Sequence, residues 1–169
     1  MGKFGVLALL AGLAGLAGCA DTATPPATAL APVVRREGAN LAAVPVTLVS
    51  LQGAPEGPGH DFQVALTREL TSRGVATAEP KKARYMLRGY LAARPGQGGA
   101  DISYVFDIYD RLRVRAARLD ASFALKGEGD AWSLLDAKTI DGLAAQSADD
   151  IAAWLSQTPE ASPALSYAQ

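Results

Sequence analysis

The chain has 169 residues, with 16 Lys and Arg against 17 Asp and Glu, so its formal net charge is −1. A near-neutral chain lacks the strong positive charge that nucleic acids and anionic membrane surfaces attract, so neither is expected as the main partner. The single cysteine, Cys19, excludes a disulfide within the chain.

The first 18 residues have the organisation of a secretory signal peptide. Lys3 is their only cation, and the run from Phe4 to Ala17 contains no charged or polar side chain. A helix that crosses the hydrocarbon core needs roughly 20 apolar residues. This run is shorter, which favours export over a membrane span.

The apolar run ends in Leu16-Ala17-Gly18-Cys19, which resembles the bacterial lipobox. The resemblance implies cleavage after Gly18, a diacylglycerol thioether on Cys19, and usually a third acyl chain on the new amine. One acyl chain binds a bilayer only marginally, so several chains would give a lasting anchor. An ordinary signal peptide with a chance cysteine is the alternative. Ala20 after the cysteine favours the outer membrane over the inner one, although Asp21 leaves the sorting open.

The two flanks of the mature chain are poor in large apolar side chains. Residues 19–43, which include "DTATPPATALAP", predict a flexible tether, because such a segment cannot bury enough surface to offset its ordering entropy. Residues 157–169 contain two prolines and little periodicity, so we expect a loose tail. One domain is therefore expected over residues 44–156.

The first half of this domain predicts a strand followed by a helix. Residues 44–51 (VPVTLVSL) are β-branched and apolar on both faces, as in a covered strand. "QGAPEGPG" then interrupts the pattern, and apolar residues at helical spacing predict a helix over residues 60–73 that ends at Gly74. Residues 75–79 (VATAE) are compatible with a short strand.

Two alternating segments, residues 84–95 and 100–110, predict a hairpin around the turn-rich "PGQGGA". Closing that loop sets Arg94 opposite Asp101. In this register one face is apolar, with an aromatic side chain over a glycine, and opposite charges are paired across the strands. The expected partners on the apolar face are Leu91 and Tyr104, Gly89 and Phe106, and Leu87 and Ile108; those on the other face are Arg88 and Asp107, and Tyr90 and Val105.

The second half ends with a further strand and a helix. Residues 113–125 predict a strand with alternate apolar side chains. One helical stripe predicts a single helix over residues 137–156 with Asp136 as its N-cap, and a start at Ser147 is the alternative.

We therefore expect an α+β fold: a mostly antiparallel sheet of four to five strands with two helices on one face. This layout resembles that of penicillin-binding-protein activators, lipopolysaccharide-assembly lipoproteins and transport-auxiliary lipoproteins. The segments "YMLRGYLAA", "DISYVFDIYD", "GDAWSLLD" and "SADDIAAWL" resemble a family of small, functionally uncharacterised lipoproteins of α-proteobacteria. The latter resemblance implies a fold and a compartment but no activity.

Catalytic chemistry finds little support in the sequence. His60 is the only histidine and starts a predicted helix, so we expect it to be solvated or capping. With Cys19 lipidated, no Ser-His or Cys-His pair has a spare partner for nucleophilic catalysis. A zinc site likewise lacks its nitrogen and sulfur ligands. Asp107 and Asp110 alternate on one strand and should not converge. We expect no catalytic residues, no metal and no cofactor.

The remaining candidate is the polar face of the sheet, a possible partner surface carrying Arg88, Tyr90, Asp107 and Tyr109, with Arg118 as a further candidate. Tyr and Arg are enriched at interaction hot spots, although a solvated face with exposed ion pairs would look the same. The sequence favours a non-catalytic, periplasm-facing outer-membrane lipoprotein that binds an envelope protein. A carrier of a lipid or glycan is second and would need a deep apolar pocket; an enzyme is third.

Overall fold

The computed structural model describes residues 34–162. The predicted signal peptide, Gly18, Cys19 and the residues up to 33 lie outside this range, as do residues 163–169. None of the helices between residues 34 and 162 is long and apolar enough to cross a membrane.

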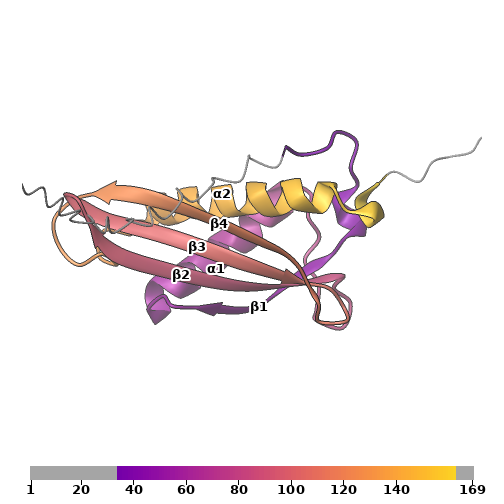
Figure 1. Ribbon diagram of the computed structural model, residues 1–169, viewed down its shortest axis with the longest axis horizontal. Coiled ribbons are helices and arrows are strands. Elements are labelled where there is room, and N and C mark those ends of the chain that lie inside the picture. Colours follow the sequence, from indigo (N-terminus) through magenta and orange to yellow (C-terminus); the bar gives the residue numbers. More distant parts are fainter. Residues whose placement is uncertain (1–33, 163–169) are drawn as a thin grey trace, which may run out of the picture. The chain divides into compact units, whose positions relative to one another are not determined.

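The described part of the chain forms one four-stranded sheet and two long helices (Figure 1). The sheet has the order β1-β2-β3-β4; β1 is parallel to β2, and the other pairs are antiparallel. The expected α+β class with a mostly antiparallel sheet is thus confirmed. In chain order the elements are 3₁₀ helix η1 (Leu41–Ala43), β1 (Val46–Gln52), α1 (Glu56–Ser72), β2 (Tyr85–Gly96), β3 (Gly99–Tyr109), β4 (Arg115–Lys126), α2 (Ala137–Ser156) and 3₁₀ helix η2 (Pro159–Ala161).

Helix α1 begins four residues earlier than predicted, at Glu56, with Pro55 at its N-cap. Pro58 is compatible with this start because the first N–H groups of a helix have no intrahelical partner. The predicted end is confirmed: Gly74 adopts a φ of +77°, in the left-handed region that favours glycine, and Val75 N–H donates to the Leu70 carbonyl at 3.0 Å. This is a Schellman arrangement.

The predicted strand at 75–79 is wrong, because only Thr77 forms a bridge, to Val46.

The predicted hairpin register is confirmed at every pair, including Arg94 opposite Asp101 and Gly89 opposite Phe106. The strands continue to Gly96 and Gly99, so the turn is shorter than the six-residue loop expected. Gly89 is required by packing: a Cβ there would lie 2.7 Å from Leu51 Cδ1 and 2.8 Å from Phe106 Cε1. The aromatic ring therefore covers the glycine, as the register implied.

Strand β4 and helix α2 also match the sequence pattern. The apolar side of β4 faces the core, although its side chains are only half-buried at this edge of the sheet. Helix α2 starts where predicted, with Asp136 Oδ1 accepting a hydrogen bond from Thr139 N–H at 2.7 Å. A start at Ser147 is wrong, since Ser147 is buried in the middle of the helix.

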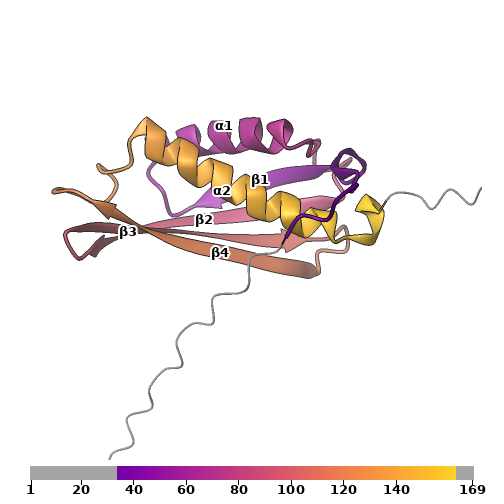
Figure 2. The same cartoon turned by 90° about the horizontal axis from the view of Figure 1, so that it is seen from above.

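Both helices cover the same face of the sheet, and the other face carries no helix (Figure 2). Their buried stripes meet the inward side chains of the strands, and the rings of Phe62 and Phe106 stack at a centroid distance of 6.4 Å. The space between sheet and helices is filled by fully buried side chains, among them Phe62, Leu66, Leu87, Phe106 and Ile151. The half-buried rings of Trp132 and Trp154 pack against this core.

The ends of the described part are more ordered than the sequence suggested. Leu41 is buried in the core, so the tether predicted as far as Ala43 is wrong in its last residues. Ala161 is buried as well, and Asn40 N–H donates to its carbonyl at 2.9 Å. A loose tail beginning at residue 157 is therefore also wrong. Neither Leu41 nor Ala161 belongs to a helical or strand repeat of apolar residues, so the sequence pattern did not indicate either packing contact.

An ion pair fastens the C-terminal segment to the start of β2: Arg84 Nε donates to Glu160 Oε1 at 2.7 Å. The hydrogen bond from Arg84 lowers the pKa of Glu160 below its usual 4.5. The pair therefore stabilises the fold above the unfolded-state pKa, and this contribution is lost as the pH falls through the lowered pKa.

Replacing Glu160 by Gln should accordingly lower the free energy of unfolding by about 1 kcal/mol or less at neutral pH, as for a partly exposed pair. Urea unfolding of both proteins should show this difference shrinking to nothing in acid. Glu79→Gln, at an exposed acid of the preceding loop, is the control. A Glu160→Gln difference that persists at low pH would assign the effect to packing instead.

Candidate functional site

The register places Arg88, Tyr90, Asp107 and Tyr109 on the face of the sheet that the helices leave uncovered, called here the open face. Arg88 is exposed, Tyr90 and Tyr109 are half-buried, and Asp107 is buried. The four residues predicted from the sequence thus share one surface on the two central strands. Arg118, opposite Asp107 on β4, belongs to the same surface.

Asp107 is the unusual residue of the open face, because only 5% of it is exposed although no helix covers it. Its Oδ1 lies 3.5 Å from Arg115 Nη1 and 3.6 Å from Arg118 Nε. Neither contact is a hydrogen bond, and Oδ1 has no hydrogen-bond partner among the described residues. Buried carboxylate oxygens without a donor are rare, so this one requires an explanation.

The expected ion pair between Arg88 and Asp107 does not form within residues 34–162, although their Cα atoms are paired. Asp107 turns to the arginines of β4, and Arg88 lies over the ring of Tyr109, with its Cζ 5.0 Å from the ring centroid. This cation–π contact holds the guanidinium over the sheet while leaving its N–H groups free. Arg94 and Asp101 are likewise opposite in register without an ion pair in the described part.

Two β-bulges determine which other side chains reach the open face. The register shifts between Leu48 and Ser50, which leaves Val49 as an extra, exposed residue of β1. A second shift pairs Tyr109 with Arg115 and leaves Ala116 as the extra residue. Strict alternation would send Arg115 to the same side as Ala117, toward the core. The bulge brings it to Asp107 instead.

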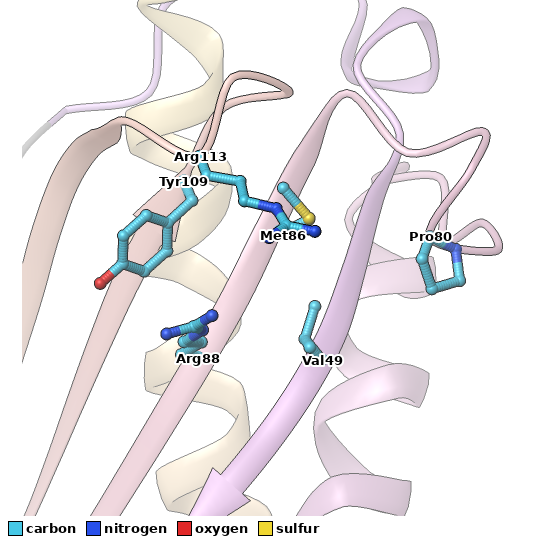
Figure 3. A pocket seen from close by; sticks show the side chains of 6 residues that line it. All are labelled: Val49, Pro80, Met86, Arg88, Tyr109 and Arg113. Carbon is cyan, nitrogen blue, oxygen red and sulfur yellow. The ribbon is translucent and has the colours of Figure 1, made fainter.

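A groove of about 400 Å³ lies at one end of the open face. Figure 3 shows Arg88 and Tyr109 on one side of it, Val49 and Pro80 on the other, and Arg113 extending toward Met86. None of these six lining residues is acidic. The groove therefore combines two cationic groups with a mainly apolar and aromatic lining.

The turn after β3 positions Arg113 at this groove. Asp110 Oδ1 accepts hydrogen bonds from the backbone N–H groups of Leu112, at 2.8 Å, and Val114, at 2.9 Å. Arg113 adopts a φ of +61°, and it is the only described residue other than glycine with a positive φ. Arg111 fastens the turn to the loop before β2 through a hydrogen bond to the Ala83 carbonyl. Asp110 thus has a structural role, and it does not converge with Asp107.

The groups considered for catalysis are dispersed. His60 is exposed on α1, on the opposite side of the sheet from Asp107. Across residues 34–162, no three His, Cys, Asp or Glu side chains lie close enough to hold a metal ion. Arg113 and Arg115 carry no sequence signal for this site, since their placement depends on a turn and a bulge.

No family model matches the chain, and no curated protein matches its sequence. Solved structures that resemble it include a minor lipoprotein from Acinetobacter baumannii, with 23% identity and a TM-score of 0.44, covering 64% of this chain and 92% of that one. Another is the PelC dodecamer from Paraburkholderia phytofirmans, with 17% identity and a TM-score of 0.47, covering 69% of this chain and 95% of that one.

Proposed function

We propose that this protein is a lipid-anchored, non-catalytic binding or assembly module of the cell envelope. Its anchor is the lipid on Cys19, in the outer membrane and facing the periplasm, and its partner is an envelope protein that docks on the open face. The lipobox-like Leu16-Ala17-Gly18-Cys19 supports the anchor. The similarity of "DISYVFDIYD" and "GDAWSLLD" to small α-proteobacterial lipoproteins supports the compartment.

The observation that carries the docking surface is the buried Oδ1 of Asp107, which lies near two arginines but accepts no hydrogen bond from the described residues. A partner that draws Arg115 or Arg118 into a hydrogen bond with this buried oxygen would remove an unfavourable feature of the free protein. Tyr90 and Tyr109 flank it, and tyrosine supplies a large contact area at a low entropic cost. An uncovered sheet face with these groups suits recognition of a protein better than bond-making chemistry.

The test replaces Tyr90 and Tyr109 together by Ala. We expect the double variant to keep its fold, because both side chains are only half-buried, and to lose partner contact, because their contact area is removed. Contact is measured with a photo-reactive phenylalanine at position 105, the open-face neighbour of Tyr90, which should cross-link a defined protein in the native envelope. The tyrosine double variant should abolish that product.

The same photo-reactive residue at Val64, which is 55% exposed on α1, is the matched control and should not yield the product. Equal cross-linking from both positions would mean that the open face is not the docking surface. Unfolding of the tyrosine variant, seen by circular dichroism, would show that these rings belong to the core, and it would contradict the proposal equally.

A further inference from the structure

The arginines of the described part differ in whether another residue accepts a hydrogen bond from the guanidinium or forms an ion pair with it. Eleven lie between residues 34 and 162, and most donate to carbonyl or carboxylate oxygens or pair with an acid. Within residues 34–162, three have neither a hydrogen bond nor an ion pair: Arg88, Arg94 and Arg113. Two of these three line the same groove.

The surroundings of the groove explain why its two guanidiniums lack a partner. The nearest carboxylate across the strands from Arg88 belongs to Asp107, and that carboxylate faces Arg115 and Arg118 on the β4 side. The carboxylate of Asp110, in the same turn as Arg113, accepts two backbone N–H groups instead. The groove therefore keeps a local positive charge that no side chain lining it neutralises.

The groove is built around the positioned guanidinium of Arg88 and the fixed backbone of Arg113. Arg88 is fixed over Tyr109, and the backbone of Arg113 is fixed by the Asp110 turn in a conformation that residues with a side chain rarely adopt. Such a conformation persists only where the surrounding structure imposes it, and it often marks a functional position. The Val49, Met86 and Pro80 side chains add an apolar wall.

We propose that this groove binds an organic phosphate with a short apolar body. Guanidinium groups present parallel N–H donors that match phosphate oxygens, and two of them balance a dianion. The thioether, the aliphatic side chains and the Tyr109 ring contact the apolar body. The volume of about 400 Å³ is that of a small-molecule site. This site shares Arg88 and Tyr109 with the proposed docking surface, but it requires no protein partner.

The experiment is isothermal titration of the purified full-length protein, in a neutral detergent, with hexyl phosphate, hexanol and inorganic phosphate. Hexyl phosphate should bind at a single site. Inorganic phosphate should bind at least about tenfold more weakly, because it lacks the apolar contacts. Hexanol should give no measurable binding, because it offers the guanidiniums no anion.

Arg88→Gln and Arg113→Gln should each weaken hexyl phosphate binding at least about tenfold, as expected for the loss of a charged hydrogen-bonding partner. Arg94→Gln is the matched control, since Arg94 is also unpaired within residues 34–162 but lies outside the groove, and it should change the affinity less than about twofold. Thermal melts establish that each variant is folded.

Three results would overturn the proposal: no binding of hexyl phosphate, equal weakening by Arg94→Gln, or equal affinity for inorganic phosphate. None of them would bear on cross-linking from position 105, so the docking function is judged separately.

Discussion

Replacing Cys19 by Ser is expected to abolish lipid anchoring in the outer membrane. The lipobox-like motif implies that the thiol forms the thioether, and a serine hydroxyl cannot replace it in that reaction. Without acyl groups the protein loses about 0.8 kcal/mol of membrane-binding free energy for every methylene group that would be buried in the bilayer. Intact-mass measurement should show an acylated mature chain for the native protein and an unprocessed, unacylated chain for Cys19→Ser. Membrane fractionation should find the native protein, but not the variant, in the outer membrane.

Asp21→Ala is the control for this experiment, because it changes the same segment and keeps the cysteine. It should leave the acyl mass unchanged. A native protein without acyl mass, or one that is cut elsewhere than after Gly18, would contradict the anchor and with it the proposed location.

The second large effect is expected in the core. Leu87 and Phe106 are both fully buried beneath the helices, and Phe106 also packs against Phe62, Tyr104 and the backbone at Gly89. Truncating such residues to Ala costs about 2–5 kcal/mol for Leu and about 3–5 kcal/mol for Phe. Domains of this kind have total stabilities of about 5–15 kcal/mol, so Leu87→Ala with Phe106→Ala should leave little folded protein. Circular dichroism and urea unfolding measure this.

The Tyr90→Ala, Tyr109→Ala pair provides the comparison, because it truncates large side chains on the other face of the same two strands. The core pair should destabilise the protein by several kcal/mol more than the tyrosine pair. Equal decreases in the free energy of unfolding for the two pairs would mean that both faces of the sheet contribute alike to the core.

The hairpin shows how much of this fold the sequence determines locally. Alternating apolar residues fix which face of each strand is buried, and a one-residue slip would expose the whole set. The packing of Phe106 over Gly89 fits only one register, which the structure confirms, whereas the opposite charges across the two strands form no ion pair in the described part. Helix α2 was equally predictable, because Asp136 gives a clear N-cap before a long apolar stripe.

The errors arose where local patterns carry no information about packing. Gly57 and Pro58 normally interrupt helices, yet both lie in the first turn of α1, where few hydrogen bonds are lost. Leu41 is buried through contacts with residues distant in the sequence, and nothing beside it in the chain indicates this.

The candidate site was predicted only in part for a related reason. Alternation placed Arg88, Tyr90, Asp107 and Tyr109 on one face, and their register is as expected. The partners of Asp107 and Arg88 differ because the bulge in β4, with its extra residue between Arg115 and Ala117, changes which arginine of that strand faces outward. Arg113 joins the groove through a single backbone angle. Bulges and left-handed residues are properties of the folded chain that side-chain periodicity does not record.

The N-terminal and C-terminal segments of the described domain are bonded to each other. Arg36 N–H donates to Ser156 Oγ at 2.8 Å, and Gln157 Nε2 donates to the Val34 carbonyl at 2.8 Å. In topological terms the polypeptide is therefore almost a closed ring, and only a short connection between residues 34 and 162 would be needed to complete it. A pull on the chain from its N-terminal side would therefore act first on the hydrogen bonds that join residues 34–36 to the C-terminal end of α2, before it reached β1 and the sheet.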